Sequence, residues 1–316
     1  MNRTEIEAAA ERIAGHVRVT PEWSLPGAFG HEGPVSLKLE LLQHAGSFKA
    51  RGAFNTLLGQ SVPAAGVAAA SGGNHGAAVA YAARALGHRA RIFVPEIASA
   101  AKIAAIRSFG AEIVVGGARY ADAQEACDRF VAESGALRVH PFDADATIAG
   151  QGTLAQEWER QAPGLDSVLV AVGGGGLIAG LASWWKDRGV RVVGVEPENS
   201  RALHAALEAG GPVDVEVHSV AADSLGARNV GARVHAICAE TVDHVCLVPD
   251  AAITAAQGVL WRDWRLAAEP GGAAALAALV AGAYRPRPGE RVGVLLCGGN
   301  VDLGKLQDLA ELQDIA

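Results

Sequence analysis

Hydrophobic positions along the chain fall into short unbroken runs, which alternate with longer alanine-rich segments that have a helical period. Unbroken apolar runs are typical of strands that are buried on both faces. The predicted strands cover residues 35–40, 66–70, 90–95, 112–116, 167–172, 191–196, 244–249 and 292–297. The predicted helices cover residues 76–86, 102–109, 121–134, 152–160, 177–187, 251–264 and 272–283. This alternation predicts an α/β protein with parallel sheets.

The alternating pattern divides into two blocks. Residues from about 53 to 144 contain three of the predicted strands, and the remainder of the chain contains the others. No linker rich in proline, glycine or serine separates the blocks, which is the pattern of one domain inserted into another. We therefore predict a large domain of residues 1–52 and 145–316 and a small domain of residues 53–144.

Composition and charge narrow the class of protein. Of the 316 residues, 50% are hydrophobic and 19% are charged, which is typical of a folded globular chain. The net charge is −7 and there is no basic block, so nucleic acid and anionic membranes are not expected as partners. The four cysteines show no paired metal-site spacing, and the charged N-terminal segment is unlike a signal peptide. These features predict a cytoplasmic protein.

Ligands of doubly wound sheets bind beyond the carboxyl ends of the strands, where this chain has four glycine-rich or polar loops. The first is a predicted loop that places Lys49 between two glycines, behind Phe48 and close to Arg51. Desolvation and a neighbouring cation would both lower the pKa of Lys49 and favour a nucleophilic amine. The other lysines lie in a predicted strand or among charged surface residues: Lys38, Lys102, Lys186 and Lys305.

Two further loops contain small polar side chains. Ser71, Asn74 and His75 lie between a predicted strand and a predicted helix, where exposed amides could bind a carboxylate. A helix cap by Ser71 or Asn74, and a structural role for His75, are equally open. Cys297 begins the loop after the last strand, and a core cysteine followed by a turn is the simpler interpretation.

The most informative loop follows the strand at 167–172. It contains Gly173, Gly174, Gly175 and Gly176 in succession, and Leu177 then begins a helix. Four glycines lose much conformational entropy on folding, so a phosphate-binding nest explains them better than a turn does.

The same loop allows a rival interpretation. Gly174, Gly176 and Ala179 match a dinucleotide fingerprint, and Glu196 ends the next strand at the position of a ribose-binding acid. An NAD-dependent oxidoreductase would therefore fit this loop alone. It would leave the loops of Lys49 and Asn74 without a role.

Several motifs occur in the order found in one enzyme family. They are Gly46-Ser47-Phe48-Lys49, the loop from Ser71 to Gly76, Ala149-Gly150-Gln151-Gly152-Thr153, the four glycines, Val195-Glu196-Pro197, Glu269-Pro270-Gly271-Gly272-Ala273 and Cys297-Gly298-Gly299-Asn300-Val301-Asp302. The chain thus resembles, from about residue 19 to 302, the serine/threonine dehydratase and serine racemase branch of the fold-type II (tryptophan-synthase-β-like) enzymes that use pyridoxal 5'-phosphate (PLP). The resemblance implies two doubly wound α/β domains, the smaller inserted into the larger, with PLP in the cleft between them.

The resemblance also implies roles for individual residues. Lys49 would bind PLP as a Schiff base and then act as the general base. The other implied cofactor contacts are Phe48 beside the ring, Asn74 at the ring hydroxyl, Gly173, Gly174, Gly175, Gly176 and Leu177 at the phosphate, and Cys297 with Glu269 near the pyridine nitrogen. Ser71, Asn74 and His75 would surround the substrate carboxylate.

The implied activity is the removal of water from L-threonine or L-serine, which gives a 2-keto acid and ammonia. A serine racemase and a dehydratase of another hydroxy amino acid, such as 3-hydroxyaspartate, are the alternatives within the family. The family also implies a homodimer that acts on a small molecule.

Four positions depart from the family pattern. Gly72 replaces the serine that racemases carry, which disfavours racemisation. Ala202 replaces an aspartate of the family's divalent-cation site near Glu196, so no metal is expected. Ser224 replaces a glycine, and Arg228 could either receive a second substrate carboxylate or remain a solvated surface residue.

Overall fold

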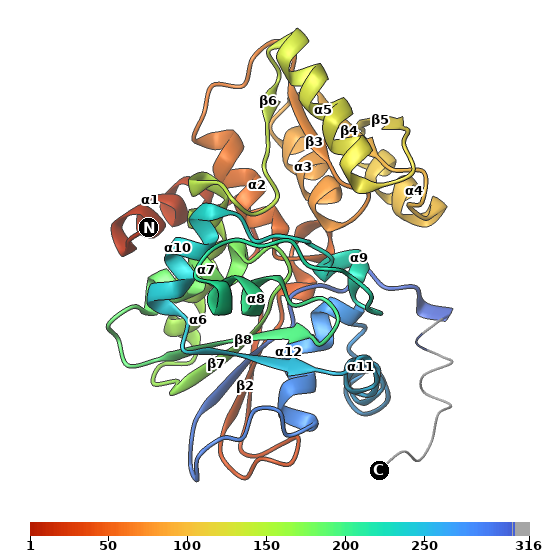
Figure 1. The fold of residues 1–316 in the computed structure, drawn as a ribbon. Coiled ribbons are helices and arrows are strands. Elements are labelled where there is room, and N and C mark those ends of the chain that lie inside the picture. Colours follow the sequence, from red (N-terminus) through yellow and green to blue (C-terminus); the bar gives the residue numbers. More distant parts are fainter. Residues whose placement is uncertain (305, 307–316) are drawn as a thin grey trace.

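A computed structural model describes residues 1–304 and 306, which form two largely parallel sheets with helices packed around them. Figure 1 shows the smaller sheet in the upper part of the view and the larger sheet in the lower part. All strands of the smaller sheet lie in the sequence between two strands of the larger one.

The larger sheet has six strands in the order β1-β2-β10-β7-β8-β9. The strands are β1 (Glu22–Leu25), β2 (Val35–Lys38), β7 (Ser167–Ala171), β8 (Arg191–Pro197), β9 (His244–Val248) and β10 (Val292–Leu295). Only β1, at the edge, pairs antiparallel with its neighbour. The carboxyl ends of the five parallel strands therefore lie along one edge of the sheet.

The smaller sheet has four parallel strands in the order β5-β4-β3-β6. They are β3 (Val67–Ala70), β4 (Ala90–Val94), β5 (Glu112–Val115) and β6 (Leu137–Arg138). Successive side chains of a strand point to opposite faces. Val67 and Ala69 accordingly belong to one apolar cluster, whereas Ala68 and Ala70 belong to another. Burial on both faces explains why β3 has no alternation of polar and apolar residues.

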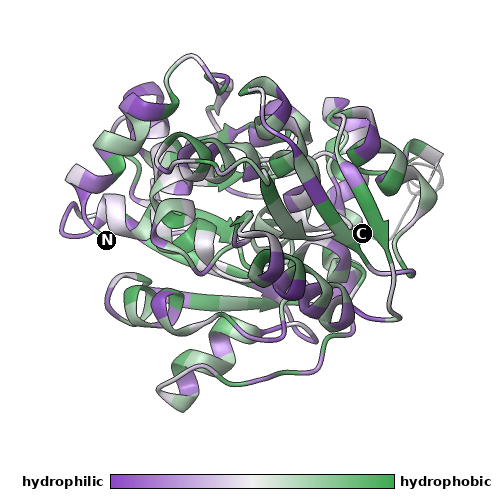
Figure 2. Ribbon diagram, turned by 90° about the horizontal axis from the view of Figure 1, so that it is seen from above, coloured by the Kyte–Doolittle hydropathy of each residue, from purple (hydrophilic) through white to green (hydrophobic). Residues whose placement is uncertain are grey.

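The helices cover both sheets, and Figure 2 shows hydrophobic residues along the strands and polar ones along the outer helices. They are α1 (Arg3–Ile13), α2 (Lys49–Leu58), α3 (Asn74–Ala85), α4 (Ala100–Ser108), α5 (Tyr120–Ser134), α6 (Asp145–Gln161), α7 (Gly176–Trp185), α8 (Ala202–Ala209), α9 (Ala222–Leu225), α10 (Ala232–Thr241), α11 (Asp250–Trp264) and α12 (Pro270–Val280). In the described part of the chain, none of them has the length and apolar character needed to cross a membrane.

Every predicted strand and helix corresponds to an element of the structure, but several elements were not predicted. The smaller sheet has a fourth strand, β6, because two residues that pair with β3 are too short to leave a pattern. The edge strand β1 and the helices α2, α8, α9 and α10 were also missed. The predicted domain boundary between residues 52 and 53 falls inside α2, and both domain boundaries stay predictions.

Helices α6 and α7 cross where two glycines meet. A Cβ atom added to Gly180 would lie 2.5 Å from the carbonyl oxygen of Ile148 and 2.6 Å from the backbone nitrogen of Gly152. Both neighbours are backbone atoms, which cannot rotate away as a side chain can. The close approach of α6 matters for the site, because α6 holds the charged groups described below.

We predict that Gly180→Ala lowers the free energy of unfolding by about 1–3 kcal/mol, which is the usual cost of overpacking. Alanine favours a helix by about 1 kcal/mol relative to glycine, so a net loss would identify the contact with α6 as dominant. Urea unfolding measures the change. Gly211→Ala is the control, since a Cβ atom there meets nothing within 4 Å. Equal or higher stability of Gly180→Ala would contradict the packing argument.

Candidate active site

Lys49 is the first residue of α2, and not part of a loop as the sequence predicted. Phe48 is the N-cap residue, and its backbone N–H donates to the carbonyl oxygen of Cys297. The chain after β10 thus fixes the start of α2. The glycines at 46 and 52 had suggested a loop, but Gly52 instead allows a close contact of α2 with Gln151 on α6.

The Lys49 amine is enclosed by protein. Its Nζ donates a hydrogen bond to the carbonyl oxygen of Pro141 over 2.8 Å and lies 5.1 Å from the centre of the Phe48 ring. Burial lowers the pKa of Lys49 to about 8, although Cys297 and Glu269 act in the opposite direction. The expected effect of desolvation is therefore confirmed, and a sizeable fraction of the amine is uncharged near neutral pH.

The predicted effect of Arg51 on Lys49 is wrong. Residues two apart on a helix do not face each other, so the two side chains leave α2 in different directions. The Arg51 guanidinium instead donates to both carboxylate oxygens of Glu40 over 2.9 and 2.7 Å, and to Glu157 over 2.9 Å. Arg51 is not among the causes of the pKa shift of Lys49.

These groups belong to a buried network of two cations and two carboxylates. Lys38 completes it by donating to Glu157 over 2.5 Å, and Thr20 donates its hydroxyl to Glu40 over 2.6 Å. Lys38, Glu40 and Arg51 are each at most 1% exposed. The network joins β2, the turn after it, α2 and α6, and it anchors the helix that presents Lys49.

Asn74 and Glu269 meet across the two sheets. The Asn74 amide donates to the Glu269 carboxylate over 2.5 Å, and its Oδ1 accepts from Asn300 over 2.8 Å. Burial raises the pKa of Glu269 to about 7, against the lowering effect of Asn74. Asn300 is a site residue that sequence reasoning missed, although it stands in the predicted polar loop after β10.

His75 and Ser71 line the same region but make local contacts. His75 Nε2 donates to the carbonyl oxygen of Val139 over 2.8 Å. Burial and the nearby Lys49 lower the pKa of His75 to about 3, so its ring is neutral. Ser71 Oγ accepts from the N–H of Gly73, and Gly73, not Ser71 or Asn74, is the N-cap of α3. The proposed contact of these residues with a substrate carboxylate stays a prediction.

The four glycines before α7 have structural reasons that the sequence did not reveal. A Cβ atom would lie 2.1 Å from the Phe142 ring at Gly174, and 2.6 Å from the Phe142 carbonyl oxygen at Gly176. At Gly173 it would lie 2.9 Å from Leu225 Cα, and Gly175 has a φ of +80°. Protein therefore fills the side-chain positions of this loop.

The amides of this loop nevertheless fit a phosphate group. Within residues 1–304 and 306, no hydrogen bond links the N–H groups of Gly173, Gly174 and Gly175 to another protein group. The unpaired amides of the first turn of α7, where Leu177 lies, follow directly. Successive free amides at a helix N-terminus attract an anion. Ser47 Oγ, beside Phe48, is a further buried polar atom without a partner.

Cys297 lies at the end of β10, where its Sγ donates to the carbonyl oxygen of Gly271 over 3.4 Å. Burial strongly raises the pKa of the thiol, so it stays protonated. The preference for a simple core cysteine on the loop alone is incomplete, because Glu269 and Lys49 act on the same thiol.

Three other predicted positions lie outside this group. Both oxygens of Glu196 accept backbone N–H groups, from Leu203 and His204, so the carboxylate caps α8 and does not point toward a ribose or a cation. The residues described contain no group of three or more metal-ligating side chains. Arg228 is exposed and donates to the carbonyl oxygen of Val215. Lys305 lies outside the described residues.

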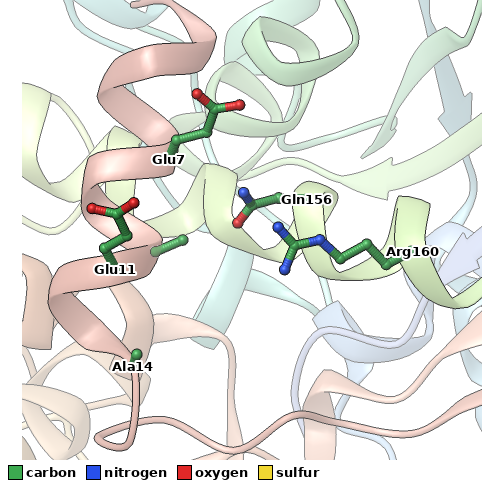
Figure 3. A pocket seen from close by; sticks show the side chains of 6 residues that line it. Glu7, Glu11, Ala14, Gln156 and Arg160 are labelled. Atoms are coloured by element: carbon green, nitrogen blue, oxygen red, sulfur yellow. The ribbon is translucent and has the colours of Figure 1, made fainter.

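A cavity of about 410 Å³ lies elsewhere, between α1 and α6 (Figure 3). Glu7, Glu11, Gln156 and Arg160 line it together with two alanines. None of the predicted site residues contributes to this cavity, so it is separate from the candidate active site.

The family model described as "Pyridoxal-phosphate dependent enzyme" matches residues 13–298. The chain belongs to this family. It is 42% identical to a phenylserine dehydratase from Ralstonia pickettii over 92% of this chain and 90% of the relative. The family confirms the resemblance seen in the sequence, and it shows that the NAD-dependent interpretation of Glu196 and the glycines is wrong.

Solved structures confirm the predicted fold class of a fold-type II PLP enzyme. Maize serine racemase matches with a TM-score of 0.91 and 32% identity, over 97% of this chain and 96% of that one. A bacterial-type match, the threonine deaminase of T.th., has a TM-score of 0.89 and 37% identity, over 96% and 99% of the two chains.

We predict that the cofactor-free PLP enzyme captures PLP faster as the pH rises, because only the uncharged amine of Lys49 is a nucleophile. The pKa of about 8 predicts a rate that rises about tenfold per pH unit below pH 8 and then levels off. Stopped-flow absorbance of the yellow product measures it, with a free lysine derivative as the control. A rate that still rose tenfold per unit above pH 9 would contradict a desolvated Lys49.

We also predict that Arg51→Leu lowers the free energy of unfolding by about 3–5 kcal/mol, because it leaves two buried carboxylates with too little positive charge. Urea unfolding of cofactor-free protein measures the loss. Arg129→Leu is the control, because its pair with Glu125 is exposed and should cost less than about 1 kcal/mol. A similar small loss in both variants would show that the buried network is not structurally important.

Proposed function

We propose that this protein is a PLP-dependent dehydratase, which removes water from a small L-hydroxy amino acid such as L-threonine or L-serine to give a 2-keto acid and ammonia. The observation that carries the proposal is the position of Lys49. A buried lysine of lowered pKa stands near the Asn74–Glu269 pair, and the same fold contains a loop of free amides. Relatives named phenylserine dehydratase and threonine deaminase support the reaction class.

The residues present can supply each binding function that PLP needs. Gly173, Gly174, Gly175, Gly176 and Leu177 would bind the phosphate through their backbone N–H groups. Asn74 would hydrogen-bond the ring hydroxyl, and Phe48 would pack beside the ring. When bound, PLP withdraws electrons from the substrate's α-carbon, and the protein supplies position and electrostatics.

Lys49 would have two tasks in this reaction. Its uncharged Nζ would bind the cofactor aldehyde, and after release by the substrate amine the same nitrogen would accept the proton from Cα. Its low pKa suits both tasks. Burial against Pro141 and Phe48 keeps water from the amine.

Glu269 and Cys297 would lie near the pyridine nitrogen. The thiol of Cys297 stays protonated because of burial, and the raised pKa of Glu269 reduces its negative charge near neutral pH. This end of the site is therefore close to neutral. Ser71, Asn74 and His75 would surround the substrate carboxylate, with His75 as a neutral hydrogen-bonding group.

Two observations bear on the alternative reactions. At Gly72, a Cβ atom would lie 2.8 Å from Ala98 Cβ and 3.1 Å from Val94 Cγ1, so a serine side chain has little room there and racemisation is disfavoured. Arg228 is exposed and engaged with Val215, which does not favour an acidic substrate such as 3-hydroxyaspartate. The relative named phenylserine dehydratase makes an aromatic hydroxy amino acid a second candidate.

We also infer a cytoplasmic homodimer. The four cysteines are buried and free, which suits a reducing compartment. The dimer rests on the family resemblance.

PLP-loaded protein, offered separately L-threonine, L-serine, L-threo-3-phenylserine and D-serine, should release keto acid and ammonia from at least one L-substrate. Lys49→Ala should lose at least about 1,000-fold of this activity, since it lacks both the covalent anchor and the base. Lys186→Ala is the control, because that lysine is exposed. Borohydride reduction followed by peptide mass spectrometry should find the cofactor on Lys49. A labelled Lys49 without keto acid from any substrate would reject the dehydratase but retain the cofactor site.

A further inference from the structure

The short helix α9 lies between the two parts of the molecule, beside the loops of the candidate active site (Figure 1). We propose that the ion pair of Asp223 on α9 with Lys102 on α4 is a positioning pair, which holds α9 across the cleft and so limits the access of solvent to the site. This inference rests on the proposed function and adds to it two residues with no role in the sequence analysis.

Helix α9 contacts all three glycine positions that border the site. A Cβ atom at Gly173 would lie 2.9 Å from Leu225 Cα, and one at Gly73 would lie 3.5 Å from the Asp223 carbonyl oxygen. At Gly271 it would lie 2.2 Å from Ser224 Oγ. One turn of helix therefore touches the phosphate-type loop, the start of α3 and the start of α12. Ser224, which replaces a family glycine, fills the space above Gly271.

The ion pair joins α9 to the other sheet. Lys102 Nζ lies 2.7 Å from Asp223 Oδ2. Lys102 belongs to α4, which packs against α3 and β5 of the four-stranded sheet, whereas α9 packs against α12 of the six-stranded part. A contact between these helices therefore crosses the cleft that separates the two sheets.

Both charges also lie close enough to act on the site. Lys102 lowers and Asp223 raises the pKa of the buried Glu269, which hydrogen-bonds Asn74. The electrostatic effect on a buried group agrees with the contacts of α9: the pair lies directly above the residues that would hold cofactor and substrate.

The exposure of the pair suits a contact that opens and closes. The side chain of Lys102 is 27% exposed and that of Asp223 is 81% exposed. Exposed pairs are weak, and their loss changes an equilibrium constant only about 1.5- to 5-fold. Such a pair can favour the closed arrangement during catalysis and still release the product, whereas a buried pair would hold the cleft shut.

The test is a charge exchange. Asp223→Lys and Lys102→Asp each place like charges together, and each should raise KM about three- to tenfold with a smaller change in kcat. The double variant Asp223→Lys/Lys102→Asp restores an attractive pair and should return KM to within about twofold of the unaltered enzyme. A merely structural role of either side chain would not be rescued by the exchange.

A second measurement does not depend on turnover. Acrylamide, a neutral quencher, should quench the fluorescence of bound PLP more strongly in each single variant than in the unaltered protein, and equally in the double variant. This result would stand even if the protein released keto acid from no substrate, so failure of the proposed function is distinguishable.

The control is a matched ion pair away from the cleft. Arg91 and Glu112 are also 2.7 Å apart and partly exposed, but both belong to the four-stranded sheet. Glu112→Arg should leave KM and quenching unchanged. The proposal is overturned if the single variants at 102 and 223 behave like this control, or if the double variant fails to restore both quantities.

Discussion

The buried network of Arg51, Glu40, Glu157 and Lys38 is the constraint on which the site depends. Two cations and two carboxylates compensate one another where water is excluded, and removal of any one would leave an uncompensated buried charge. The network ties the first turn of α2 to β2 and α6. Since that turn begins with Lys49, the position of the reactive amine depends on charges that take no part in the chemistry.

Helix α2 separates charge from chemistry. Arg51 lies on the side that faces α6 and is fully paired, whereas Lys49 projects into a region where His75 and the thiol of Cys297 are neutral. An amine in such surroundings loses its proton more readily because no paired carboxylate stabilises the charged form. The same helix therefore supplies a permanently charged anchor and an amine that is partly uncharged near neutral pH.

Much of this organisation was predictable from local patterns. Unbroken apolar runs identified eight strands correctly because parallel strands are buried on both faces. Lys49 was singled out by exclusion of the other lysines and by its neighbours. The predicted loop around Lys49 was wrong, because Gly46 and Gly52 were interpreted as turn residues, whereas Gly52 serves a helix contact. Strand β6 was missed because its pairing covers two residues.

The sequence by itself determined the order of strands and helices, the class of fold and the identity of the reactive lysine, because these follow from local periodicity and contiguous motifs. Only the tertiary structure decided which distant groups meet. Asn74 reaches Glu269, Lys102 reaches Asp223, and Glu196 turns to the amides of α8. Such contacts depend on how the two sheets pack and on the direction of each side chain, and neither leaves a pattern in neighbouring residues.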